Sequence, residues 1–308
     1  MRILIATDFS QHATNAVALV RAMPLSQGSL IRVINAIEPI TTVGVFAPSA
    51  FVEISDTTER EVLAELRKIT DTLTRTDMVT ADAVVRFGRA ADVVIDEAAN
   101  FAPDLIVVGS RGRGGLASAV LGSVSAEIVD RASCPVLVAR AATLTRLVLG
   151  DDGSTSASAA ALAIAGLAPF ARLPVRVVSV VDVPFPMVVE GAGAAPYYAY
   201  EAAMPALRAA HAQYASERAA SLGRLGITAT SEHREGDAAA ELIDAAREFG
   251  ADCIVVATRG QTGLQRVLLG SVARGVLFHA PCSVLIAHSP RLVEAARSAH
   301  DAEPAHVG

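Results

Sequence analysis

The stretch from Val107 to Ser125 decides the fold, and it reads VVGSRGRGG over residues 107–115 and LGSVS over residues 121–125. The apolar run 105–108 predicts a buried strand, and the residues from Ser123 onward predict the start of a helix. The glycines between them predict a loop with backbone angles that other residues rarely adopt. Backbone N–H groups converge on such a loop, and the helix end adds partial positive charge. The stretch therefore predicts an anion-binding cradle.

The same stretch occurs a second time along the chain. Residues 255–263 read VVATRGQTG and residues 269–273 read LGSVA, so that Gly260 matches Gly112. The start of the chain is repeated as well, with Asp152 matching Asp8. Such a long repeat is not a solenoid and predicts a tandem duplication of one domain. We expect domains at residues 1–141 and 142–289, followed by a tail over residues 290–308.

The composition excludes several classes of protein. The chain has 308 residues, of which 52% are hydrophobic, so most of it can fold around a core. Its net charge of −6 argues against a nucleic-acid-binding protein. The longest apolar region, residues 157–181, is interrupted by two prolines and two arginines, and it therefore predicts a helix and then a strand instead of a membrane span.

Two features predict a cytoplasmic location. The N-terminal residues reach Asp8 too soon for a secretory signal peptide. The three cysteines, Cys134, Cys253 and Cys282, lack the spacing of metal ligands, and we expect free, structural thiols typical of a reducing compartment.

Apolar runs alternate with helical patterns along both halves of the chain. In the first half we expect strands at 3–6, 31–37, 81–87, 105–108 and 136–139. We expect four helices between them: one that Ser10 caps, one over 57–74, one within 88–101 and one that starts at Ser123. We expect loops over 40–55 and, in the second half, over 191–200. This alternation predicts an α/β fold, namely two tandem flavodoxin-like or Rossmann-like domains. Each is a five-stranded parallel sheet in the order 3-2-1-4-5 with helices on both faces.

Asp8 and Gly109 directly follow two strands that are neighbours in this order. Ligands of open parallel sheets bind beyond the carboxyl ends of the strands, where the strand order reverses. A carboxylate beside a phosphate cradle predicts a nucleotide site. Taken alone, Asp8 is also interpretable as an acid at the start of a helix, and the glycines as a tight connection. The repetition of both features favours the site.

The pattern Gly-x2-Gly-x9-Gly-Ser, formed by Gly109, Gly112, Gly122 and Ser123, with an aspartate after the first strand, resembles the nucleotide-binding universal stress protein family. The resemblance covers nearly the whole chain as two copies. It implies that Asp8 and Ala36 contact adenine, and that the loop holds the ribose and phosphates of ATP. The implied first site comprises Thr7, Asp8, Ala36, Gly109, Arg111, Gly112, Gly122, Ser123, Val124 and Ser125. The implied second site comprises Asp151, Asp152, Val180, Ala257, Arg259, Gly260, Gly270, Ser271 and Val272.

The second copy departs from the family pattern. Ala257 replaces the first glycine, and Ala273 stands where the first copy has Ser125. Alanine does not readily adopt a positive φ and carries no hydroxyl. One lost neutral hydrogen bond costs about 1 kcal/mol. We therefore expect the second site to be weaker.

The resemblance further implies a stress-response regulator that binds an adenine nucleotide, with Mg²⁺ coming on the nucleotide, and that acts on a protein partner. It also implies paired edge strands, in a homodimer or between the two repeats. A slow ATP hydrolase or nucleotidyl transferase is the alternative. We find no catalytic triad, and we expect four histidines, His12, His211, His233 and His279, to face solvent.

Overall fold

The computed structural model describes residues 1–38, 48–75, 78–112, 121–182, 195–258 and 269–288, and side chains are left aside at 48–56 and 195–200. The chain divides into two compact units, Met1–Thr143 and Leu144–Gly308. No helix in the described ranges is both long and apolar enough to cross a membrane.

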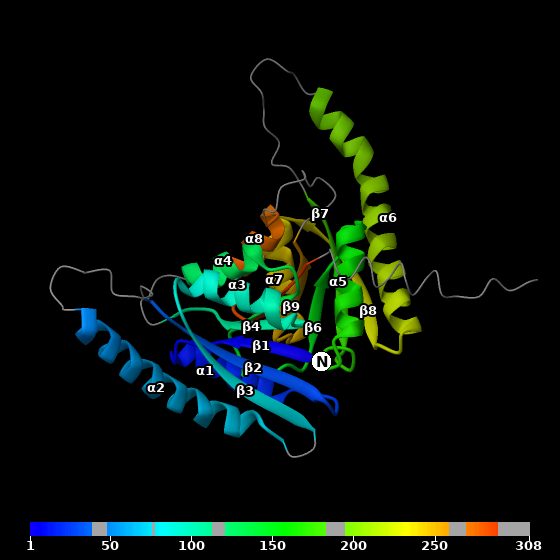
Figure 1. Cartoon of the computed structure of the whole chain (residues 1–308). Coiled ribbons are helices and arrows are strands. Elements are labelled where there is room, and N and C mark those ends of the chain that lie inside the picture. Colours follow the sequence, from blue (N-terminus) through cyan, green and yellow to red (C-terminus); the bar gives the residue numbers. More distant parts are fainter. Residues whose placement is uncertain (39–47, 76–77, 113–120, 183–194, 259–268, 289–308) are drawn as a thin grey trace, which may run out of the picture. The chain divides into compact units, whose positions relative to one another are not determined.

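The first unit alternates strands and helices (Figure 1). In chain order its elements are β1 (Arg2–Ala6), α1 (Gln11–Ala22), β2 (Ser29–Ile37), α2 (Pro48–Leu73), β3 (Val79–Phe87), α3 (Ala90–Phe101), β4 (Leu105–Gly109), α4 (Ser123–Arg131) and β5 (Val136–Ala139). The strands pair in parallel in the order β3-β2-β1-β4-β5, as predicted. The inner strands β1 and β4 are continuous buried runs, because helices cover both of their faces.

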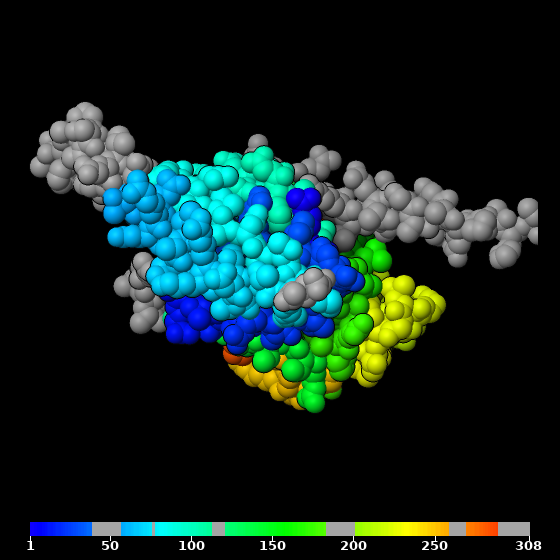
Figure 2. Space-filling view, turned by 60° about the horizontal axis from the view of Figure 1, so that its bottom comes forward, coloured from blue at the N-terminus to red at the C-terminus, as the bar shows by residue number. Residues whose placement is uncertain are grey.

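Two pairs of helices cover the sheet of this unit. Helices α1 and α2 contact each other, as do α3 and α4. Strand β3 is the outer strand, and Figure 2 shows the light-blue and cyan residues of α2 and β3 at the surface of the unit. The helices occupy both faces of the sheet, and the ends of the strands are therefore where the predicted nucleotide site can lie.

The second unit repeats this plan. Its elements are β6 (Leu147–Gly150), α5 (Thr155–Gly166), β7 (Val175–Asp182), α6 (Ala195–Arg224), β8 (Ala229–Gly236), α7 (Ala238–Phe249), β9 (Cys253–Ala257), α8 (Ser271–His279) and β10 (Ser283–Ala287). They form a parallel sheet in the equivalent order β8-β7-β6-β9-β10. The predicted helix and strand within 157–181 are confirmed as α5 and β7.

Two predicted loops were partly wrong. Helix α2 begins at Pro48, inside the loop expected over 40–55, and α6 begins at Ala195, inside the loop expected over 191–200. Proline is well tolerated in the first turn of a helix, so Pro48 marks a start instead of a break. The alanine and tyrosine residues from Ala195 onward extend a helix that its later residues anchor to the sheet. The remainder of both predicted loops and the predicted tail lie outside the described residues.

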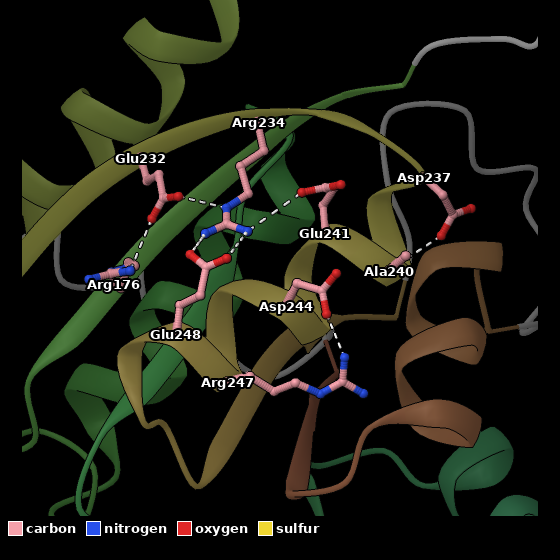
Figure 3. A network of polar contacts seen from close by, with 9 residues as sticks. All are labelled: Arg176, Glu232, Arg234, Asp237, Ala240, Glu241, Asp244, Arg247 and Glu248. Atoms are coloured by element: carbon pink, nitrogen blue, oxygen red, sulfur yellow. Dashed lines mark hydrogen bonds and ion pairs between the residues drawn. The ribbon is translucent and has the colours of Figure 1, made fainter.

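A cluster of charges fastens α7 to the outer strand β8 of the second unit (Figure 3). Arg234 of β8 donates to Glu232 at 2.6 Å and to Glu248 of α7, and it lies 3.5 Å from Glu241. Its side chain is only 12% exposed. Burial alone would lower the pKa of Arg234, but hydrogen bonds to Glu248 and Glu232 outweigh it and raise that pKa. A single guanidinium thus bridges three carboxylates, of which Glu232 also pairs with Arg176 at 3.2 Å.

We expect Arg234→Met to destabilise the protein, since Glu241 and Glu248 would lose the counter-charge that they share and Glu232 would be left with Arg176. Breaking a buried pair costs about 3–5 kcal/mol, but the glutamates are partly exposed, so we expect about 1–2 kcal/mol. Denaturant unfolding near neutral pH measures this loss. Arg247→Met, which removes an exposed pair with Asp244 on the same helix, is the control and should change stability by less than about 0.5 kcal/mol. Equal effects of the two substitutions would contradict the assignment.

Candidate functional site

The loop after β1 is shaped by hydrogen bonds to its own side chains. The backbone N–H of Ser10 donates to Asp8 Oδ1 at 3.0 Å, and the N–H of Ala13 donates to Ser10 Oγ at 3.3 Å. Ser10 is therefore the N-cap of α1, as predicted. The second unit repeats both bonds, since Ser154 caps α5 and its N–H donates to Asp152 Oδ1 at 3.0 Å. Each predicted carboxylate is thus held at the carboxyl end of the first strand of its unit.

The glycine-rich loop after β4 closes on itself at its base. The N–H of Gly122 donates to the carbonyl of Ser110 at 2.7 Å, so the loop returns to the point from which it leaves. Helix α4 starts there with Gly122 as its N-cap, and no side chain among the described residues caps it. The second unit repeats the closure between Gly270 and Thr258 at 2.7 Å, and α8 starts in the same way. The first amides of these helices are thereby left available to an anion.

The loops after β1 and β4 meet in the first unit. Ser10 Oγ donates to the carbonyl of Arg111 at 3.3 Å. A Cβ added to Gly112 would lie 2.7 Å from Asp8 Oδ2, which is closer than real contacts allow. A side chain at position 112 would therefore have to displace the carboxylate of Asp8 from its present position. The predicted proximity of carboxylate and glycine loop is present in this geometry.

Gly109 is required for a different reason from the one predicted. Positive φ angles occur at other described glycines, and not at Gly109, Gly112 or Gly122. A Cβ on Gly109 would lie 2.6 Å from the carbonyl carbon of His12 and 2.8 Å from the nitrogen of Ala13, both on the backbone of α1. The glycine permits the close approach of α1 to β4. The replacement of this glycine by Ala257 therefore affects the packing of helix on strand in the second unit. The expectation that this position needs a positive φ was wrong.

Ser125 is tied to the fold. Its hydroxyl donates to the carbonyl of Gly109 at 2.7 Å, and the residue is 7% exposed. Its proton is thus already used within the unit. Ala273 of the second unit lacks this bond between α8 and β9.

The register of the first two strands in each unit positions the residues predicted to contact adenine. Ala6 pairs with Ile34, so Asp8 and Ala36 stand two residues further along neighbouring strands. Asn35 Nδ2 donates to the carbonyl of Thr7 at 2.7 Å and fixes this edge. In the second unit Gly150 pairs with Val178, which brings Asp152 and Val180 into the same relation.

Two of the histidines expected to face solvent are half-buried instead. His12 Nδ1 lies 3.4 Å from Ser110 Oγ, and His211 Nδ1 lies 2.9 Å from Ser179 Oγ. Burial and Arg111 lower the pKa of His12, although Asp8 acts in the opposite direction. Burial lowers the pKa of His211, against the influence of Asp152. His233 and His279 are exposed, as expected.

The remaining predicted residues divide by exposure. Ser123, Val124, Ser271 and Val272 are exposed at the starts of α4 and α8. Arg111 is half-buried at the carboxyl end of β4, and Asp151 is buried after β6. Arg259 and Gly260 lie outside the described residues. Sequence reasoning missed His12, although its place two residues after the cap Ser10 was a usable signal, and His211, for which no motif exists.

We expect Gly109→Ala to destabilise the protein by about 1–3 kcal/mol, because the new methyl group would meet the backbone of α1. Ala257→Gly, at the matching position of the second unit, leaves a space that requires no rearrangement and is expected to cost about 1 kcal/mol at most. Thermal and denaturant unfolding of both variants measure the difference. A harmless Gly109→Ala would show that α1 can move away from β4 at little cost.

We expect acid to destabilise the protein partly through His12 and His211. The folded chain holds their pKa values below 6.5, so the unfolded chain binds protons first as the pH falls. These groups therefore leave stability unchanged above pH 6.5 and reduce it below that value, until the folded pKa is reached. His211→Gln should reduce the loss measured by urea unfolding between about pH 7.5 and 5.5. His279→Gln, at an exposed position, should leave the loss intact, and equal slopes for both variants would contradict the prediction.

Comparison with known proteins places the chain in a family. The model of the universal stress protein family matches residues 1–140 and 143–288. A universal stress protein of Thermus aquaticus is 33% identical over 138 residues, which are 45% of this chain and 97% of that protein. A universal stress protein from Archaeoglobus fulgidus has the same fold, with a TM-score of 0.63, 18% identity and coverage of 94% and 98% of the two chains.

A further universal stress protein, solved in complex with cAMP, is 25% identical, with a TM-score of 0.31 and coverage of 48% of this chain and 98% of that one. The two matches of the family model correspond to the duplicated halves of the sequence. The chain belongs to the universal stress protein family, as a tandem member with two copies of the domain.

Proposed function

We propose that each unit binds an adenine nucleotide, with ATP as the preferred ligand, at the carboxyl ends of its first and fourth strands. The observation that carries this proposal is the contact of Gly112 with the Asp8 carboxylate, at a would-be Cβ distance of 2.7 Å. A hydrogen-bond acceptor, a glycine of the loop and the uncapped start of α4 lie near one another there, which supports the proposal. An adenine amino group and a phosphate chain are the ligand groups that suit this combination.

In the first site, Asp8 and the backbone of Ala36 would receive the base, and Thr7 would support them. Phosphates would accept from the backbone amides that open α4. Their proposed contacts are Gly109, Gly112, Gly122, Ser123, Val124 and Ser125, with Arg111 as the neighbouring cation. Mg²⁺ would arrive on the phosphates of the nucleotide.

The second site would use Asp151, Asp152, Val180, Ala257, Arg259, Gly260, Gly270, Ser271 and Val272. We propose weaker binding there. The loss of Ser125 at position 273 removes a bond that fixes the start of the helix to the strand, so the amides of α8 would be less well ordered before a ligand binds.

We propose that the bound nucleotide makes this cytoplasmic chain a regulator of a protein partner in a stress response. A ligand that binds only the folded state stabilises it by RT ln(1 + [L]/Kd), which is about 2.7 kcal/mol at a hundredfold excess over Kd. Nucleotide concentration would thereby set the stability of each unit and of surfaces built from it. Pairing of edge strands, within the chain or between two chains, remains our proposal for its assembly.

A slow ATP hydrolase is the second candidate, and His12 is the observation in its favour. Its imidazole lies against Ser110 in the site, and burial keeps its pKa low enough for it to accept a proton near neutral pH. We expect turnover well below about 1 per second, which is slow for an enzyme. A phosphate-release assay on the protein and on His12→Gln measures it. Faster turnover that His12→Gln abolishes would establish the enzyme.

We expect calorimetric titration with ATP to reveal two unequal sites per chain. Asp8→Ala should weaken the tighter site by about tenfold or more, since a charged hydrogen bond contributes about 1.5–3 kcal/mol. Asp71→Ala, on the exposed side of α2, is the control and should bind like the unaltered protein.

Titrations with ADP, AMP and cAMP, together with mass spectrometry of any nucleotide that co-purifies, identify the preferred ligand. Absence of binding by the unaltered protein to all four nucleotides would contradict the proposal and favour a scaffold with vestigial sites.

A further inference from the structure

Helix α6 contacts the second predicted site at three places, two in the loop after β6 and one in strand β7. Arg218 pairs with Asp151, the ring of Tyr214 lies against Gly153, and His211 Nδ1 lies 2.9 Å from Ser179 Oγ. Asp151 and Gly153 flank Asp152, and Ser179 precedes Val180. Each contact of α6 therefore falls beside a residue that we propose to meet the base.

The ion pair is the deepest of these contacts. The side chain of Asp151 has no exposed area, and that of Arg218 is 17% exposed. One carboxylate oxygen of Asp151 accepts from the N–H of Gly153 at 2.7 Å, and the other accepts from Arg218 Nε. Arg218 Nη2 also donates to Ser158 Oγ of α5 at 2.7 Å. Asp151 thus joins the loop that carries Asp152 to the helix.

The first unit holds the same loop without such a pair. Thr7 matches Asp151, and its hydroxyl oxygen accepts from the N–H of Phe9 at 3.1 Å, just as Asp151 accepts from Gly153. The loop shape is the same, since Phe9 and Gly153 have φ angles of 61° and 77°. The difference lies in the anchor, which is a local hydroxyl in one unit and a carboxylate paired with a helix in the other.

The chemistry of the two anchors differs in its dependence on a partner. A hydroxyl accepts a hydrogen bond with no counter-charge, whereas a fully buried carboxylate is stable only while it is paired. If α6 withdrew, Asp151 would have to reach water, and it would take Gly153 and Asp152 with it. Tyr214 of α6 packs closely on Gly153, since a Cβ at Gly153 would lie 2.8–2.9 Å from atoms of the Tyr214 ring. This contact opposes the withdrawal of α6 from the loop.

We infer that Arg218 is a positioning residue of the second nucleotide site, and that the docking of α6 through the Asp151–Arg218 pair makes that site competent, whereas Thr7 anchors the matching loop of the first site without an ion pair. This inference rests on the proposed function for its ligand.

Hydrogen exchange of the full chain without nucleotide tests the positioning step independently of any ligand. Arg218→Met should raise amide exchange in residues 151–154 by about tenfold or more and leave residues 7–10 unchanged. Arg208→Met is the matched control on the same helix, since it removes an exposed pair with Glu235, and residues 151–154 should then exchange normally. The double variant Asp151→Thr/Arg218→Met supplies the anchor of the first unit and should restore protection.

ATP titration in an Asp8→Ala background, in which the first site is weakened, tests the functional step. Arg218→Met should lower the remaining affinity by about tenfold, and Asp151→Thr/Arg218→Met should recover most of it. Unchanged exchange in Arg218→Met would overturn the inference, as would normal affinity despite raised exchange. The double variant contains neither the ion pair nor an uncompensated buried carboxylate, so recovery of protection and affinity would attribute the loss in Arg218→Met to the unpaired Asp151. If exchange responds as expected but the unaltered protein binds no nucleotide, the proposed function fails while Arg218 keeps its positioning role.

Discussion

The approach of two loops at the carboxyl ends of β1 and β4 is the constraint on which the first unit depends. Parallel pairing of these strands brings Asp8 and the chain after Gly109 to the same edge. Gly112 then passes the carboxylate, and Gly109 lets α1 lie on β4. A larger residue at position 109 would push α1 away from β4, and one at position 112 would displace the Asp8 carboxylate, so both packing of the unit and geometry of the site depend on these glycines.

The duplication shows how far this requirement can be relaxed. The second unit keeps the serine cap of α5 and the 2.7 Å closure between Gly270 and Thr258, which are backbone features that any ligand-holding loop needs. It changes the residues that support these features, with Ala257 for Gly109 and Asp151 for Thr7. At these two positions the copies differ, and the hydrogen bonds after the first strand and at the start of the glycine-rich loop are retained.

Much of this organisation was predictable from the sequence. Apolar runs such as 105–108 are short, fully buried and bounded by glycine or aspartate, so strand positions and the serine caps followed from local pattern. Helix starts at Pro48 and Ala195 did not follow, because their neighbouring residues carry loop-like composition and only later turns contact the sheet. The roles of Gly109, His12 and Arg218 depend on residues about 60 to 100 positions away, and only the folded geometry reveals them.

The residue that precedes each helix affects where an anion can bind at this edge of the sheet. Helices α1 and α4 of the first unit both point their amino ends there, and so both could attract an anion. Ser10 Oγ accepts from the N–H of Ala13 in α1, whereas Gly122 offers α4 no such oxygen. The serine thus satisfies an amide at the start of α1, and the glycine leaves the first amides of α4 open to an anion. Of these two neighbouring helix starts, that of α4 is therefore the better suited to hold an anion.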